Sequence, residues 1–190
     1  MSPKAIMRVL VAAGGVFLIA LAPANAQTLD QESPNMNASF NADASSLTWQ
    51  QEVTVGLAGP LVQIELYVTT PGSCDVFINA GAPWQYDAND FETTLVADSV
   101  GWKTIDTSPA GLSFNPDDHF VIGIHGLDTG MWLGGSYLPP EGGYDRGRLW
   151  LNEAIHDDTD WDIAFRTYVP EPGTLALLSL GALAMVSRRR

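Results

Sequence analysis

The chain has 190 residues, of which 22 are acidic and nine are lysine or arginine, giving a formal net charge of −13. A surface with this excess of negative charge repels phosphate backbones, so we expect no nucleic-acid partner. Cys74 is the only cysteine, which excludes an intramolecular disulfide, and we expect it to be a buried, unreactive thiol.

The first 26 residues have the organisation of a secretory signal peptide. Lys4 and Arg8 precede an apolar stretch over residues 9–22, and the small-residue sequence Ala-Asn-Ala follows at residues 24–26. A positive, an apolar and a small-residue region in this order are typical of such a leader. We therefore predict export of the chain, with cleavage by signal peptidase after Ala26.

Residues 27–169 are long enough to form one domain with a sizeable core. This segment holds four basic residues against 21 acidic ones, a net charge of −17. Residues 27–46 are polar and show little apolar periodicity, so they form either a loose leader or an irregular first strand. From Leu47 onward, apolar residues recur at every second position, which is the period of half-buried β-strands.

Eight or nine short segments between Gly/Pro-rich turns fit β-strands, and no segment fits an amphipathic helix. These segments cover residues 47–55, 62–68, 74–78, 91–97, 102–106, 119–125, 131–137, 148–152 and 161–169. The pattern predicts an all-β domain folded as an antiparallel β-sandwich or jelly roll.

The sequence patterns of common enzymes are missing. There is no His-Glu-x-x-His motif, no Gly-x-Ser-x-Gly elbow and no glycine-rich phosphate loop. His119 and His125 share one face of a predicted strand, but about 20 Å of extended chain separates them, too far to share a metal. We expect a non-catalytic protein. A glycoside-acting enzyme is the alternative, because two of the many acids could lie at a hydrolytic spacing.

The densest acidic cluster contains Asp157, Asp158, Asp160 and Asp162. Calcium takes about six to eight oxygen ligands, and a loop rich in carboxylates can supply several of them. The cluster lacks the glycine and glutamate of an EF-hand, and aspartates in a turn also bond to their own backbone. It therefore predicts either a calcium site or a solvated hairpin turn.

The tryptophans divide into two groups by their neighbours. Trp49 and Trp161 share a strand face with apolar residues, so we expect them in the core. Trp84 and Trp132 lie in Gly/Pro-rich segments, and Trp150 points away from the leucines on either side of it. Exposed rings can stack on sugar faces, which makes these three candidate carbohydrate contacts. Alternatively, they cover the ends of the core.

Residues 170–190 have three ordered features. Pro170, Glu171 and Pro172 end the last predicted strand, an apolar run covers residues 175–186, and three arginines close the chain. Twelve helical residues are about 18 Å long against a hydrocarbon core of about 30 Å, so this short transmembrane helix would anchor the chain only transiently. The arginines favour the cytoplasmic side.

This order of features resembles the PEP-CTERM sorting signal of Gram-negative bacteria. The resemblance implies recognition by an exosortase, processing near the motif, and delivery to the cell surface or an extracellular matrix. Residues 51–55, 61–68 and 162–169 also resemble a β-sandwich module exported with this tail, similar in pattern to carbohydrate-binding jelly rolls. We expect a surface-sorted binding module associated with matrix or exopolysaccharide, or alternatively a purely structural coat component.

Overall fold

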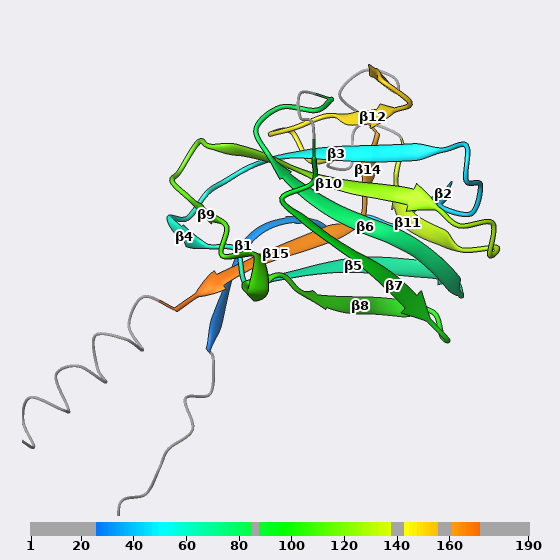
Figure 1. Ribbon diagram of the computed structural model, residues 1–190, viewed down its shortest axis with the longest axis horizontal. Coiled ribbons are helices and arrows are strands. Elements are labelled where there is room, and N and C mark those ends of the chain that lie inside the picture. The colour runs from blue at the N-terminus through cyan, green and yellow to red at the C-terminus, as the bar shows by residue number, and fades with distance from the viewer. Residues whose placement is uncertain (1–25, 85–87, 138–142, 156–160, 172–190) are drawn as a thin grey trace, which may run out of the picture.

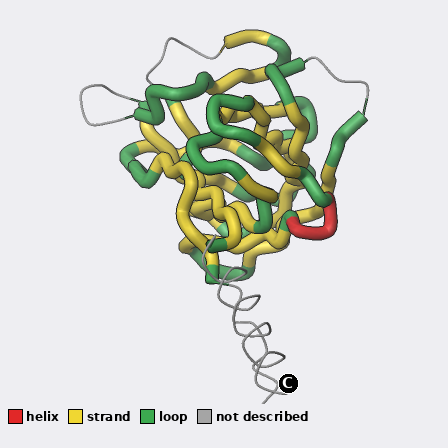
Figure 2. Tube along the Cα trace, turned by 90° about the vertical axis from the view of Figure 1, so that its left-hand side faces the viewer, coloured by secondary structure: helices red, strands yellow, loops and turns green. Residues whose placement is uncertain are grey.

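The computed structural model describes residues 26–84, 88–137, 143–155 and 161–171. Within these ranges the chain is all-β, as predicted, and its one helical turn is the 3₁₀ segment Ser108–Ala110 (η1, red in Figure 2). The predicted leader before Ala26 and the apolar run after Glu171 lie outside the described residues. No helix in the described ranges is long and apolar enough to cross a membrane.

The strands form two large antiparallel sheets and one small one (Figure 1). The seven-stranded sheet contains β1 (Gln27–Ser33), β15 (Phe165–Pro170), β5 (Gln63–Thr70), β11 (Trp132–Ser136) and β14 (Asp162–Ile163), with β2 (Ala38–Asn41) on β11 and β8 (Gly101–Asp106) on β5. The six-stranded sheet has the order β13 (Ala154–Ile155), β12 (Leu149–Leu151), β3 (Thr48–Thr54), β10 (His119–Gly126), β6 (Gly72–Ala80) and β7 (Phe91–Ala97). The two-residue strands β4 (Gly59–Pro60) and β9 (Ser113–Phe114) pair separately.

One hydrophobic core lies between the two large sheets. It takes alternate residues from both, including Val53 and Ile122 from the six-stranded sheet and Leu66 from the seven-stranded sheet. A fully buried side chain of this size contributes roughly 1.5–3 kcal/mol. As predicted, Trp49 is buried in this core and Trp161 packs against it. The two layers are compatible with the predicted β-sandwich.

The polar start of the domain is an irregular strand, the second of the two conformations predicted for it. β1 pairs with β15, and its register shifts between Leu29 and Gln31. The carboxylate of Asp30, at this irregularity, accepts hydrogen bonds from the backbone N–H groups of Gly56 (3.0 Å) and Leu57 (2.6 Å). Backbone pairing with β15 and the hydrogen bonds of Asp30 therefore order this segment, although its sequence lacks the apolar periodicity of a strand.

The two ends of the domain lie side by side. Gln27 pairs with Pro170, so β15 continues one residue beyond the predicted end of the domain. The backbone N–H of Glu171 donates to the carbonyl of Ala26 at 2.9 Å. The predicted leader cleavage site and the first residues of the sorting motif therefore meet at one end of the β1–β15 ladder (Figure 1).

Cys74 is fully buried in β6. Burial, with a smaller contribution from the neighbouring Asp75 carboxylate, raises the pKa of the thiol to about 12. Because the thiolate is the reactive form, the folded chain should keep this thiol inert at neutral pH.

We expect native protein at pH 8 to resist a thiol-reactive disulfide reagent, and to react fully once denatured. The folded thiol keeps its proton over a range in which the unfolded thiol ionises, so its contribution to stability is complete below about pH 8.5. That contribution should decline as the pH rises from there toward 12. Rapid modification of the native protein would contradict the buried assignment.

Candidate functional site

The outer face of the six-stranded sheet carries the polar residues that alternate with the core. In β10, Ile122 and Ile124 point inward, and His119 and His125 therefore share the opposite face, as predicted. His125 Nδ1 lies 2.9 Å from the hydroxyl of Thr48 on β3. The two histidines are thus placed in side-chain networks of this face, separated by the length of β10.

One row of this face crosses from β12 to β6. Gln50 of β3 lies opposite Trp150 of β12 on one side and Gly123 of β10 on the other. Gly123 in turn lies opposite Phe77 of β6. A Cβ atom added to Gly123 would lie 2.0 Å from the Phe77 ring, so this ring packs directly over the glycine backbone. The glycine is needed here because of this close approach.

A hollow of about 420 Å³ opens beside this row, and we call it the aromatic hollow. It is lined by Thr48, Gln50, Phe77, Asn79, Trp84, Asn89 and Glu153. The lining combines two aromatic rings with three amides, one hydroxyl and one carboxylate. A concave surface with apolar rings and a few polar groups is typical of a small-molecule or saccharide site.

Hydrogen bonds fix the orientation of the amides in the aromatic hollow. The Gln50 side-chain oxygen accepts from the backbone N–H of Trp84 at 3.2 Å. Asn79 donates through its side-chain nitrogen to the Asn89 oxygen at 3.1 Å, and its own oxygen accepts from the N–H of Asp90 at 3.1 Å. Since Gln50 and Asn79 are also nearly fully buried, the hollow is organised before any ligand arrives.

Trp84 has two unusual features. Its backbone φ is 59°, in the left-handed region that bulky residues rarely adopt and that is enriched at functional sites. Its indole N–H is buried, as is that of Trp150, and neither has an acceptor within the described part of the chain. Buried donors without a protein acceptor are commonly satisfied by water or a ligand. Both residues adjoin Gln50, Trp84 through its backbone N–H and Trp150 through strand register.

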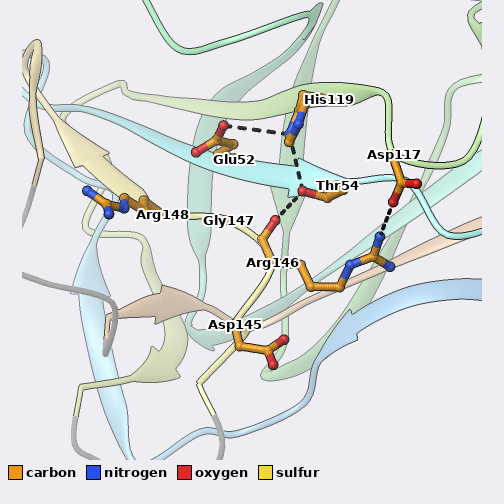
Figure 3. A pocket seen from close by; sticks show the side chains of 8 residues that line it. All are labelled: Glu52, Thr54, Asp117, His119, Asp145, Arg146, Gly147 and Arg148. Carbon is orange, nitrogen blue, oxygen red and sulfur yellow. Dashed lines mark hydrogen bonds and ion pairs between the residues drawn. The ribbon is translucent and has the colours of Figure 1, made fainter.

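A second hollow, of about 440 Å³, lies farther along β3, and we call it the polar hollow (Figure 3). It is lined by Glu52, Thr54, Asp117, His119, Asp145, Arg146, Gly147 and Arg148. The Thr54 hydroxyl donates to the Arg146 carbonyl, so the His119 Nδ1–H, 3.1 Å away, donates to Thr54. Nε2 of the neutral ring is then an acceptor.

The polar hollow holds three carboxylates and two guanidinium groups beside His119. The Arg146 guanidinium pairs with the carboxylate of Asp117 at 3.1 Å, and both side chains are substantially exposed. His119 Nδ1 lies 3.7 Å from a Glu52 oxygen, and in Figure 3 both side chains point toward each other. Exposed ion pairs of this kind contribute little to stability. The hollow is polar without being a concentrated anion or cation site.

The structure places the three predicted carbohydrate contacts in different parts of the domain. Trp84 lines the aromatic hollow, and Trp150 lies on the same face beside Gln50. Trp132, in contrast, is the first residue of β11 in the seven-stranded sheet, where it is 39% exposed. This strand was predicted over residues 131–137, and the backbone of Trp132 pairs with Asn41 and Thr70.

Sequence reasoning missed Phe77, Asn79 and Glu153 as residues of this face. A usable signal existed for the first two, because Phe77 and Asn79 have the opposite parity from Cys74, Val76 and Ile78 of the same strand. An aromatic ring and an amide on the outer face of a predicted strand are candidate ligand contacts. Glu153 gave no such signal, since its role depends on the turn in which it lies.

Only one of the predicted calcium ligands lies in the described residues. Asp162 is fully buried in β14; one of its oxygens accepts from the Gln51 side-chain amide at 3.0 Å, and the other from the Tyr144 N–H. Both carboxylate oxygens therefore already accept hydrogen bonds inside the domain. Asp157, Asp158 and Asp160 lie outside the described residues. The described ranges contain no cluster of three His, Cys, Asp or Glu residues suited to a metal, and the calcium site stays a prediction.

Comparison with known families matches residues 169–190 to the PEP-CTERM protein-sorting motif, which confirms the resemblance of the tail. The chain is thus an exported protein sorted to the cell envelope or surface. It carries a PEP-CTERM signal and is recognised by an exosortase during export. A search of curated proteins gave no significant match. The family match covers only the tail, so the function of the domain has to be inferred from the residues of the domain itself.

We expect Asp162→Ala to lower the free energy of unfolding by about 3 kcal/mol, because the buried Gln51 amide and Tyr144 N–H lose their acceptor. Chemical denaturation measures the change. Asp98→Ala is the matched control, since the Asp98 side chain is 98% exposed and should change stability little. Equal stability of the two variants would contradict a structural role for Asp162.

If the acidic loop binds calcium, millimolar calcium should raise the melting temperature relative to chelator, and Asp160→Ala should abolish the rise. The melting temperature of the wild type and the variant tests this directly. A solvated turn predicts the same melting temperature in calcium and in chelator. A rise that persists in Asp160→Ala would place the ion elsewhere.

Proposed function

We propose that the exported domain is a non-catalytic binding module for an extracellular polysaccharide, with the aromatic hollow as its binding site. The observation that carries this proposal is the arrangement of Phe77 and Trp84 around the fixed amides of Gln50 and Asn79. As the sequence predicted, the sandwich would be a jelly roll, and the protein would be delivered to an extracellular matrix.

The chemistry of the lining suits a sugar. Aromatic rings offer apolar area to the C–H face of a pyranose at little cost in conformational entropy. Amide groups donate and accept at once, which matches the hydroxyl groups of a saccharide, and the bonded amides of Gln50 and Asn79 cannot rotate freely.

The position of the hollow suits a surface-sorted protein. Figure 1 shows the ends of β1 and β15 at the lower left, and β3 and β12, which border the hollow, at the top of the molecule. Because the sorting tail follows β15, a chain held at that end presents the aromatic hollow away from the attachment point. A ligand outside the cell would then reach it without obstruction by the envelope.

The number of carboxylates in the site favours binding without hydrolysis over the enzyme alternative. Glycoside hydrolysis needs a pair of carboxyl groups roughly 5–9.5 Å apart across the scissile bond. In the described lining of the aromatic hollow, Glu153 is the one carboxylate. The structural-coat alternative needs no hollow of this composition, so the rings and fixed amides favour ligand binding over it as well.

We expect Trp84→Ala to weaken polysaccharide binding about tenfold or more, since it removes a ring of the hollow. Trp132→Ala is the matched control, because it removes an exposed tryptophan from the other sheet. A glycan array, followed by calorimetry with the best ligand, measures both variants.

Loss of binding in Trp132→Ala with full binding in Trp84→Ala would contradict the assignment of the hollow. Failure of the wild-type domain to bind any polysaccharide would leave the structural-coat function instead. Release of reducing sugar that depends on an acidic residue would establish the enzyme alternative.

A further inference from the structure

We propose that Glu153 makes the aromatic hollow selective for uncharged polysaccharides over anionic ones. The inference rests on the proposed function and names the class of ligand that the hollow accepts. It depends on three observations: the turn in which Glu153 lies, the contacts that hold this turn, and the distribution of positive charge over the domain.

Glu153 occupies a backbone position that favours glycine. Asn152 and Glu153 connect β12 to β13, and their φ angles are 46° and 70°. Positive φ at both central residues is the geometry of a type I′ hairpin, in which Asn-Gly is the preferred pair. Asn152 follows this preference and Glu153 departs from it. A glutamate is therefore held in a conformation that disfavours its side chain, and that side chain lines the aromatic hollow.

The turn is held firmly against the start of β3. The side-chain oxygen of Asn152 accepts from the N–H of Thr48 at 2.9 Å, and its side-chain nitrogen donates to the Ser46 carbonyl at 3.0 Å. The backbone N–H of Asn152 also donates to the Thr48 carbonyl at 3.1 Å. Thr48 itself lines the hollow. The backbone that carries Glu153 is thereby held at the rim, beside the rings and amides that would contact a sugar.

Positive charge does not offset this carboxylate. The domain has four Lys and Arg residues, all within the described ranges, and none of them lines the aromatic hollow. Arg146 and Arg148 line the polar hollow, and Lys103 and Arg166 belong to strands of the seven-stranded sheet. The other charged neighbours are acidic: Glu92 accepts from Asn89 at 2.8 Å.

His125 lies on the same outer face, and its Nδ1 is 2.9 Å from the Thr48 hydroxyl. A ligand carboxylate placed on the rings would therefore meet the Glu153 carboxylate with no lysine or arginine partner in the lining. Desolvating a charge without a partner is unfavourable, and a like charge nearby adds to the cost. Neutral hydroxyl groups meet neither penalty and can donate to the Glu153 carboxylate.

The test uses pairs of polysaccharides that differ only in charge: cellulose, amylose and galactan oligomers, each with its C6-oxidised carboxylate form. Binding of the wild-type mature protein is measured by calorimetry at low and high salt. We expect at least about fivefold tighter binding of the neutral member, with the difference shrinking as salt screens the carboxylates.

Two variants separate selectivity from folding. Glu153→Gln keeps the size of the side chain and should reduce the neutral-to-oxidised affinity ratio at least about threefold, mainly by tightening binding of the oxidised oligomer. Glu153→Gly restores the residue that the turn prefers, so it should raise the melting temperature while reducing the ratio likewise. Glu32→Gln, on the other sheet, is the control and should leave the ratio unchanged.

An unchanged ratio in both Glu153 variants, with Glu153→Gly merely more stable, would show that the residue has only a turn role and overturn the inference. Tighter binding of the oxidised oligomers by the wild type would also overturn it while leaving the proposed binding function intact. Failure of every neutral and oxidised oligomer to bind would contradict the proposed function itself, and the inference with it.

Discussion

The buried carboxylate of Asp162 fixes how the two sheets of this domain meet. It accepts from the Gln51 amide at 3.0 Å and from the Tyr144 N–H, while the Gln51 oxygen accepts from the Ile163 N–H at 3.0 Å. These bonds join β3 of one sheet to β14 of the other inside an otherwise apolar core. A slip of one residue would leave every one of these groups unpaired, so the contact sets the register of β3.

The outer face of the six-stranded sheet depends on that register. Because side chains alternate along a strand, holding Gln51 inward directs Gln50 and Thr48 outward into the aromatic hollow, and Glu52 and Thr54 outward into the polar hollow. Pairing through β10 then brings Phe77 and Asn79 to the same face. One polar contact in the core thus positions residues on the surface that are far apart in the sequence.

The sequence allowed the all-β class and the nine main strands to be predicted, because apolar periodicity reports directly on a half-buried sheet. Strands β1 and β2 were less evident, since backbone pairing and the Asp30 cap order them without such a pattern. Trp84, for which the sequence left two alternatives open, lies outside the main core cluster, and Asp162 was grouped with its acidic neighbours although it is buried. The pairing register decides which residues of β12, β3, β10 and β6 lie side by side on one face. That register depends on contacts between distant segments, so it could not be predicted from the pattern of any one strand.

Hydrogen exchange of the mature protein with and without a bound polysaccharide is the most direct test of where the domain binds. We expect protection of amides at the hairpin of residues 151–154, the start of β3 and residues 79–84, with little change in β8 and β15 on the other sheet. Protection confined to the seven-stranded sheet around Trp132, or to the polar hollow alone, would contradict the assignment of the aromatic hollow as the binding site.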